Sequence, residues 1–441
     1  MSAHREAWRL AWPLILSNVT VPLLGLTDTA VLGHLDSPHH LSAVAAGSAA
    51  FNLIHFAFVF LRMGTTGLVA QAWGRGDGQG VRDLLGRGLL LAGGLALGLL
   101  VLGPLLVLAA SALFGASPDV DAGLRTYLGI RLLGVPAGFL GLVVLGWLLG
   151  LQDARGPMLL MIVVNGINIA LDLLLVLGFG LATAGVALAT VAAEYAGLAL
   201  ALVLVRRALR GVDGRFTPLP ALVRAGGFGR MIRVNRDIFV RSLALQAGFI
   251  TFAAIGARLG EGVLAANAIL LNLQTLAAFV LDGFAHAAEA MVGRQVGRAD
   301  RAGVRAAIAA NAGLALGLAL ALALAFLLFG ELVVRGMTTI ETVRAQAFPY
   351  LPYVVALPVI SVWAFLFDGV FIGATRTEVM RDGMILAFLV FAAAAVALVP
   401  TLGNHGLWIA FLIFMAWRGA WLAVAYLRIE AGPTGFAGAR P

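Results

Sequence analysis

The chain has 441 residues, of which 61% are hydrophobic and only 12% charged, and its mean hydropathy is +0.98. Soluble domains carry about 25% charged residues, so this composition excludes an ordinary soluble protein and predicts an all-α polytopic membrane protein. The net charge of +8 reflects arginines that fall mainly in short loops, where they indicate topology and not a nucleic-acid partner. The absence of cysteine excludes disulfides and thiolate metal sites.

The first apolar run, residues 10–35, carries one carboxylate, Asp28, and two prolines, Pro13 and Pro22. An ionisable group inside a membrane span is costly and is by default a candidate for function. The arginines before this run resemble the start of a signal peptide. The run is too long for one, however, and no small-residue cleavage site follows, so we expect an uncleaved first helix.

Charges and turn residues divide the chain into segments long enough to cross a membrane. The sequence predicts twelve transmembrane helices, near residues 8–33, 41–73, 84–114, 124–149, 157–180, 183–206, 237–258, 262–296, 304–334, 345–373, 379–402 and 405–428. Most arginines lie in the loops after the even-numbered spans. The positive-inside rule assigns these loops to the cytoplasm, so we expect a multi-pass protein of the bacterial inner membrane with both termini cytoplasmic.

An internal repeat relates the two halves of the chain. Residues 74–82, GRGDGQGVR, match residues 297–305, GRADRAGVR, and the same offset of 223 residues aligns Gly146 with Gly369 and Gly150 with Gly373. Each repeat holds six spans, so the two are parallel copies. We expect an N-lobe (1–206), a cytoplasmic linker (207–233), a C-lobe (234–430) and a cytoplasmic tail (431–441), with the lobes around a central cleft.

The fifth span of the N-lobe carries Asn165, Asn168 and Asp172 at positions i, i+3 and i+7, which share one face of a helix. No arginine lies within one turn of Asp28 or Asp172 in the sequence. Burial without a cation favours the protonated carboxyl, so these acids are candidates to carry a proton. A hydroxyl such as that of Thr190 can complete the site. The same oxygens suit sodium, and their spacing does not decide between the two ions.

Asp28 and Asp172 could instead be tied into structural hydrogen bonds between helices. Their positions in the second repeat hold Thr251 and Ala395, and this asymmetry favours a functional role. Pro13 is also confined to the first repeat. Proline removes a backbone hydrogen bond, so Pro13 predicts either a bending point or a static kink in the first helix.

The C-lobe has polar residues of its own within its spans. Asp282, His286 and Glu289 follow i, i+4 and i+7 in span 8, while Arg241 lies in span 7 and Asp368 in span 10. These residues form either a second polar site or a structural ion pair in which Arg241 neutralises one acid.

With these features in hand, the chain resembles the MATE (multidrug and toxic compound extrusion) family, and within it the DinF branch. The resemblance covers nearly the whole chain and is carried by SNVTVPLLGLTDTAVLGHLDS, GWLLGLQDARGP, NRDIFVRSLALQ and DGVFIGATR. It implies an N-lobe proton site at Asp28, Asn168 and Asp172, with a threonine at Thr190 and a helix bend at Pro13.

We therefore expect a secondary active exporter, a monomer, in which lipophilic and often cationic small molecules leave by alternating access as protons enter. No cofactor is expected beyond the coupling ion, which could be sodium. The alternatives are a flippase for lipid-linked sugars and a membrane-embedded enzyme. The sequence has no GxxxxGK[ST] loop for ATP and no HExxH cluster, so we expect no enzyme.

Overall fold

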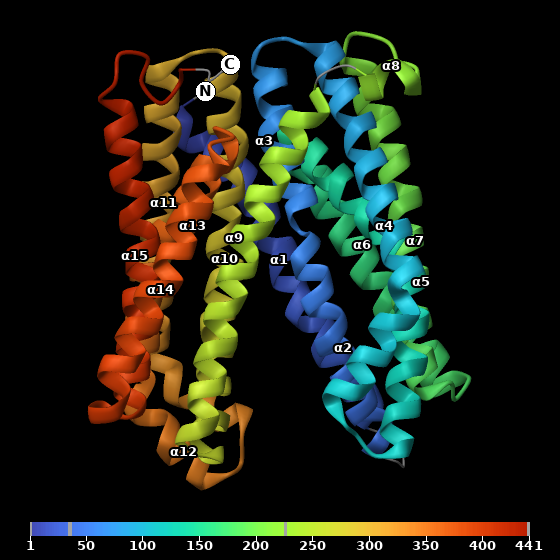
Figure 1. Ribbon diagram of the computed structural model, residues 1–441, viewed down its shortest axis with the longest axis vertical. Helices are drawn as coiled ribbons and strands as arrows, with labels where there is room; N and C mark the ends of the chain where they lie inside the picture. Colours follow the sequence, from blue (N-terminus) through green and yellow to red (C-terminus); the bar gives the residue numbers. More distant parts are fainter. Residues whose placement is uncertain (1, 34–37, 225–226, 439–441) are drawn as a thin grey trace. The chain divides into compact units, whose positions relative to one another are not determined.

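The computed structural model describes the backbone of residues 2–33, 38–224 and 227–438 (Figure 1). The side chains of residues 21–26, 28–30, 33, 38 and 224 also lie outside the described part. Throughout these ranges the regular structure is helical. The helices, in chain order, are α1 (Ala3–Gly33), α2 (Pro38–Phe58), α3 (Phe60–Gly74), α4 (Gly78–Phe114), α5 (Pro118–Gly150), α6 (Arg155–Asp172), a π-helix (Leu173–Gly178), α7 (Ala182–Ala208), a 3₁₀ turn (Leu209–Gly211), α8 (Leu219–Arg224), α9 (Gly227–Leu259), α10 (Glu261–Gly297), α11 (Arg301–Met337), α12 (Glu341–Ala347), a 3₁₀ turn (Phe348–Tyr350), α13 (Leu351–Gly373), α14 (Thr377–Leu402) and α15 (Asn404–Glu430).

The prediction of an all-α polytopic membrane protein is confirmed. Eleven helical segments of the described residues are long and apolar enough to cross a membrane, and α1 occupies the remaining predicted span. The predicted and observed helix limits differ most at the start of α9. This helix begins at Gly227, inside the segment expected to be a linker. The start of α9 is amphipathic, because Met231, Val234 and Ile238 are buried while Arg233 is exposed. Its arginines led the sequence analysis to assign this stretch to the linker.

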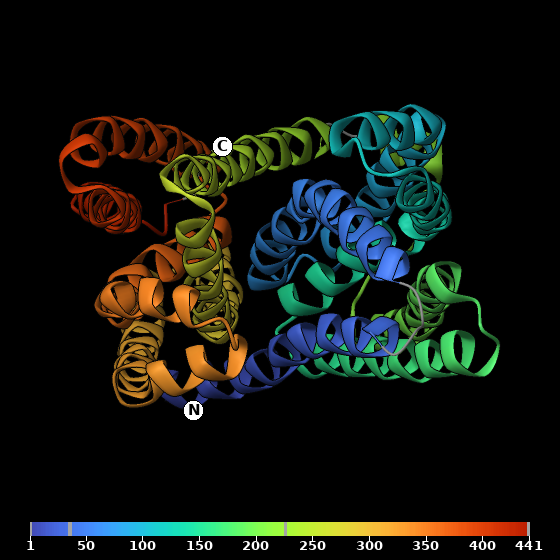
Figure 2. The ribbon, with the colours of Figure 1, turned by 90° about the horizontal axis from the view of Figure 1, so that it is seen from below.

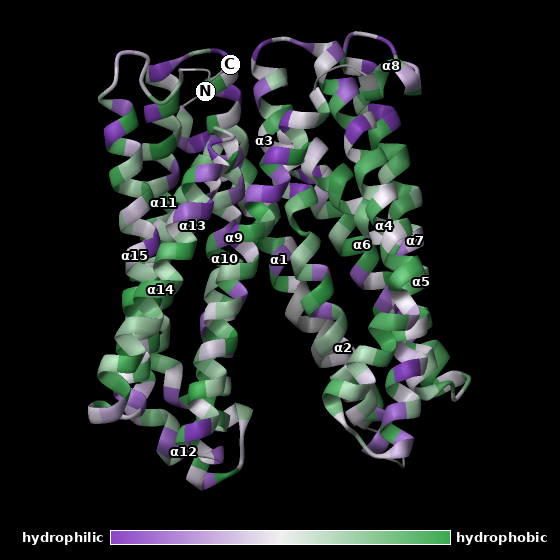
Figure 3. Ribbon diagram, viewed as in Figure 1, coloured by the Kyte–Doolittle hydropathy of each residue, from purple (hydrophilic) through white to green (hydrophobic). Residues whose placement is uncertain are grey.

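Apolar stripes on the outer helices identify surfaces that face lipid. Leu97, Val101 and Leu105 of α4 are 63–73% exposed, and they recur every four residues on one helical face. The corresponding residues of α11, at 320, 324 and 328, are also exposed leucines. Hydrophobic residues cover the middle of the helices and hydrophilic residues gather towards their ends (Figure 3). A soluble protein rarely exposes such stripes, and a bilayer accounts for them.

The sequence repeat is a structural repeat. Asp77 caps the start of α4 by accepting a hydrogen bond from the Gly80 N–H (2.7 Å), and Asp300 caps α11 in the same way through Gly303 (2.8 Å). Gly146 of α5 lies against the carbonyl of Arg62, while Gly369 of α13, 223 residues later, lies against that of Ala285. A side chain at either glycine would collide with that backbone, so the repeated glycines permit the same close helix contact in both halves.

The chain forms two compact units, which we call the N-unit (residues 16–231) and the C-unit (residues 1–15 and 232–441). Within each unit the helices run side by side (Figure 2). The boundary lies inside α1 and again inside α9, so the first fifteen residues, expected in the N-lobe, pack with the second half of the chain. Glu6 forms an ion pair with Arg294 of α10 (2.6 Å), and the Trp8 ring contacts that of Phe284 (6.1 Å between centroids).

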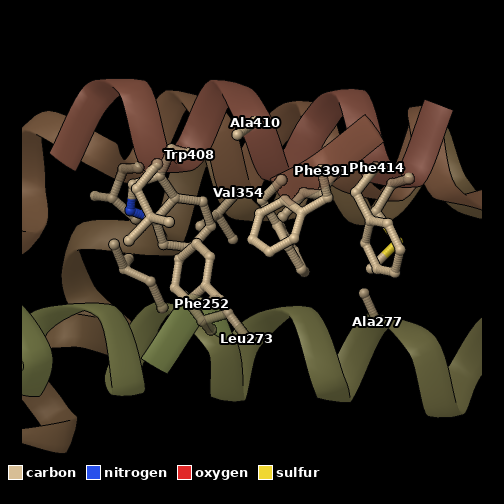
Figure 4. Packing of buried hydrophobic residues seen from close by; sticks show 14 of the residues in the cluster. Phe252, Leu273, Ala277, Val354, Phe391, Trp408, Ala410 and Phe414 are labelled. Carbon is tan, nitrogen blue, oxygen red and sulfur yellow. The ribbon is translucent and has the colours of Figure 1, made fainter. Parts of the chain in front are cut away.

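An aromatic core holds the C-unit together (Figure 4). Phe252 of α9 and Trp408 of α15 are fully buried, and their rings meet edge to face with 5.1 Å between centroids. The Trp408 indole N–H donates to the Asn267 side-chain oxygen (2.9 Å). This bond satisfies the polar atom of a large buried ring, so the core fixes the packing of α9, α10 and α15.

Candidate functional site

The three polar residues of α6 lie on a buried face, as their spacing predicts. Asn165, Asn168 and Asp172 are 8%, 1% and 0% exposed. Asp172 ends α6, and the chain continues without a break into the π-helix Leu173–Gly178. π-Helical turns are rare and occur frequently at functional sites, so the change of helix type directly after the buried acid marks this place in the N-unit.

Asn168 joins Asp172 to α7. With its amide oriented to satisfy both neighbours, the Asn168 nitrogen donates to a carboxylate oxygen of Asp172 (2.8 Å) and its oxygen accepts from the Thr190 hydroxyl (2.9 Å). The same Thr190 hydroxyl lies 3.0 Å from the carbonyl of Val186 one turn earlier. The structure thus brings together three of the predicted coupling residues in one hydrogen-bonded group between α6 and α7.

Asn165 makes a different connection, to α1. Its amide nitrogen donates to the Thr20 hydroxyl (2.6 Å), which in turn donates to the Ser17 carbonyl (2.6 Å). Thr20 lies eight residues before Asp28 in the same helix. Asp28 itself belongs to α1, but its side chain lies outside the described residues, so its predicted place beside Asn168 and Asp172 stays a prediction.

Pro13 is buried within α1, and the helix continues through it. Gly283 of α10 faces this stretch: a side chain there would lie 3.1 Å from the Ala11 carbonyl oxygen and 3.2 Å from the Ile15 nitrogen. The close packing of the two backbones therefore depends on glycine. Two residues after Pro13, α1 passes from the C-unit to the N-unit, so the proline lies close to the point where the helix changes its packing partners.

The N-unit also contains a buried ion pair that was not predicted from the sequence. Arg131 of α5 donates to Glu194 of α7 (3.0 Å), and its guanidinium lies 4.0 Å from the centre of the Phe51 ring of α2. Both side chains are largely buried, at 7% and 16% exposure. Gly134 leaves room for the Glu194 carboxylate. The available signal was an arginine and a glutamate inside two predicted apolar spans.

This ion pair leads to a stability prediction. Arg131→Leu removes the cation and leaves Glu194 buried, so we expect the variant to lose about 3 kcal/mol of stability. Arg131→Leu/Glu194→Leu removes both charges and is expected to recover most of that loss. Thermal unfolding in one detergent compares the two variants, and equal unfolding temperatures would show that the pair does not stabilise the fold.

Two of the predicted polar residues of the C-unit, Arg241 and Asp368, meet in the structure. Arg241 of α9 and Arg418 of α15 both donate to the same oxygen of this carboxylate, the second at 3.1 Å. All three are at least 93% buried. Arg241 thus neutralises an acid, as one of the two predicted alternatives had it. Arg418 was missed, although an arginine inside the predicted apolar span 12 was the available signal.

The acids of α10 occupy different environments. Glu289 is fully buried, whereas Asp282 and His286 are partly exposed. The negative charge of Asp282 interacts favourably with the guanidinium of Arg418. Among the described residues, no group of three or more His, Asp or Glu is placed to hold a metal ion. Asp368 and Asp282 of the C-unit are therefore associated with arginines, while the N-unit site is built from amides, hydroxyls and one carboxylate.

Comparisons with known proteins agree with this architecture. The family model MatE matches residues 13–174 and 238–400, one stretch in each repeat. DNA damage-inducible protein F of Escherichia coli is 44% identical over 439 residues, which cover 99% of this chain and 95% of that protein. A probable multidrug resistance protein NorM of Thermotoga maritima is 26% identical over 94% of this chain and 90% of its own length.

Solved structures share the fold. An outward-facing multidrug resistance MATE transporter superposes with a TM-score of 0.89 at 21% identity, covering 98% of this chain and 97% of that one. MATE structures described as bent and straight each give a TM-score of 0.88 at 21% identity, with coverage of 98% of this chain and of 96% and 97% of theirs, respectively. The chain belongs to the MATE family of multi-pass membrane transporters and is not an enzyme.

Proposed function

We propose that this transporter exports lipophilic, often cationic small molecules in exchange for protons, and that Asp172 carries the proton. The fully buried carboxylate of Asp172 accepts a hydrogen bond from Asn168, which in turn accepts one from Thr190, and this arrangement supports the proposal. A carboxylate inside a membrane span is costly, so its presence there is by default a reason to expect a function. Asp28, which the resemblance places in the same site, would be the second proton carrier.

Substrate is exchanged for a proton if protonation of Asp172 and binding of substrate in the N-unit exclude each other. A protonated Asp172 needs fewer polar partners, so its surroundings can close around it; an ionised Asp172 requires polar partners or a cationic substrate. When one proton enters in exchange for a neutral molecule, one charge moves down the potential, and at 100 mV this releases about 2.3 kcal/mol, enough for roughly fifty-fold accumulation. Exchange for a monovalent cation moves no net charge and is driven by the pH difference, which supports about tenfold accumulation per pH unit. A single carboxylate therefore suffices to drive concentrative export.

We further propose the bacterial inner membrane, with both termini in the cytoplasm. The start of α1 pairs with the end of α10 through Glu6 and Arg294 (2.6 Å), and the start of α11 pairs with the end of α15 through Arg301 and Glu430 (2.7 Å). These four helix ends lie at one end of the C-unit. Arginine is abundant there, which favours the cytoplasmic side.

Purified protein in liposomes tests the coupling ion. An imposed proton gradient without sodium is expected to drive uptake of a fluorescent lipophilic cation, and substrate added without a gradient is expected to release protons. A sodium gradient at equal pH on both sides is expected to drive none. Transport under the sodium gradient alone would show that the coupling ion is sodium.

Pro13 provides a test of the motion. Pro13→Ala restores the hydrogen bond that proline removes, so α1 becomes stiffer where it changes its packing partners. We expect the variant to bind substrate with near-normal affinity at high pH and to lose most of the release caused by acidification. Substrate affinity measured against pH checks this, and an unchanged pH dependence would mean that Pro13 is only a static kink.

A further inference from the structure

A cavity at one end of the N-unit is distinct from the proton site. It has a volume of about 430 Å³ and lies where α4 begins and α7 ends, at the end of the unit that carries α8 (Figure 1). Three arginines line it, Arg82, Arg206 and Arg210, and no acidic residue does. Its other walls are apolar and include Leu202, Val205 and Phe216.

Arg82 forms the inner wall and is held by backbone carbonyls. Its Nη2 donates to the carbonyls of Leu209 (2.8 Å) and Val212 (2.7 Å). These bonds fix the guanidinium without neutralising it. The Phe216 ring lies 5.5 Å from the same guanidinium and is 65% exposed. Arg82 therefore keeps a full positive charge in a defined position.

Arg206 and Arg210 form the outer wall, one helical turn apart. Both are exposed, and in the described ranges neither forms an ion pair with a carboxylate. Like charges at this spacing repel each other. An anion between them and Arg82 would relieve that repulsion and interact with three cations at once.

The apolar walls decide which anion fits. Leu202 lines the cavity and is 56% exposed, and the next residue, Val203, lies outside the lining and is 62% exposed. Both belong to α7 and precede Arg206 along the helix. Inorganic phosphate would leave these side chains and the Phe216 ring uncovered. A phospholipid covers them with its acyl chains while its phosphate reaches the arginines. Basic pockets beside transmembrane helices are suited to anionic headgroups.

We propose that this cavity binds the headgroup of an anionic phospholipid, with the phosphodiester between Arg82, Arg206 and Arg210 and the acyl chains along α7. The bound lipid would join α4, the end of α7 and the segment that follows it. A cavity of similar size, about 450 Å³, between α4 and α8 is lined only by glycine and apolar residues, so it offers no selection by charge.

The test compares stabilisation by phosphatidylglycerol with stabilisation by phosphatidylcholine in the intact protein. The readouts are the unfolding temperature in nanodiscs and bound lipid counted by native mass spectrometry. Phosphatidylglycerol is expected to raise the unfolding temperature of the wild-type protein above its value in phosphatidylcholine. Arg206→Gln/Arg210→Gln is expected to bind phosphatidylglycerol about 25-fold more weakly, since each guanidinium near a membrane contributes about five-fold.

Arg207→Gln is the matched control, because Arg207 is exposed and adjacent but does not line the cavity. It is expected to keep the preference for phosphatidylglycerol. Referring each variant to its own value in phosphatidylcholine removes any change in basal stability. Equal effects of the two lipids, an equal loss in Arg207→Gln, or full competition by inorganic phosphate at equal concentration would each overturn the proposal. None of these results depends on the coupling ion.

Discussion

Replacing Asp172 by asparagine is expected to abolish proton-driven export while the protein remains folded and inserted. The carboxylate is fully buried, and one of its oxygens accepts from Asn168 at 2.8 Å. An asparagine amide has the same shape and can still accept that bond, but it cannot exchange a proton. Uptake of a lipophilic cation into everted vesicles under a proton gradient is expected to fall about tenfold for each pH unit of the imposed gradient, the accumulation that one proton supports in an exchange without net charge.

Asp119→Asn serves as the control, because Asp119 belongs to the same unit, lies in the first turn of α5 and is exposed. It removes one carboxylate without touching the site, so transport is expected to be normal. Substrate binding at high pH separates loss of coupling from loss of the protein. Near-normal export by Asp172→Asn would move the proton to another group, and Asp28 would be the first to examine.

The arrangement of α6 could be predicted from its sequence only in part. Helical spacing placed Asn165, Asn168 and Asp172 on one face, and all three are buried there. The spacing does not say which helix lies opposite. Thr190 was named as a candidate hydroxyl and was also implied by the resemblance to a family, whereas Thr20, the partner of Asn165, was not expected. Periodicity gives the direction of a side chain, but its partner depends on tertiary packing.

The two buried ionic groups show the same limit more clearly. Arg131 and Glu194 are 63 residues apart in sequence, and Arg418 lies 50 residues after Asp368. Each of these residues alone is a charge in an apolar span, which indicates burial with a partner. Which charges pair depends on how the helices pack, and the partner cannot be inferred from the other repeat. Asp172 corresponds to Ala395, and Asp368 corresponds to Leu145. The two halves share a backbone arrangement and differ in the charges buried within it.

The C-unit charges have an energetic consequence. Asp368 bridges Arg241 and Arg418, so its loss would leave two buried guanidinium groups without their shared anion. Removing one partner of a buried ion pair commonly costs about 3–5 kcal/mol, because the remaining charge stays desolvated. Loss of Arg418 is less costly, since the pair between Asp368 and Arg241 remains. The two changes are therefore expected to differ strongly although they break the same contact.

Asp368→Asn is accordingly expected to unfold at a much lower temperature and to insert poorly, whereas Arg418→Met is expected to be mild. Methionine suits that position because the Arg418 guanidinium lies 5.7 Å from the centre of the Phe414 ring and 5.8 Å from that of Phe365. Asp368→Asn/Arg418→Met should be more stable than Asp368→Asn alone, because only one guanidinium is then unpaired. Thermal unfolding of the three variants in one detergent measures this order. A stable Asp368→Asn protein that has lost proton coupling would contradict it and would assign the coupling carboxylate to the C-unit.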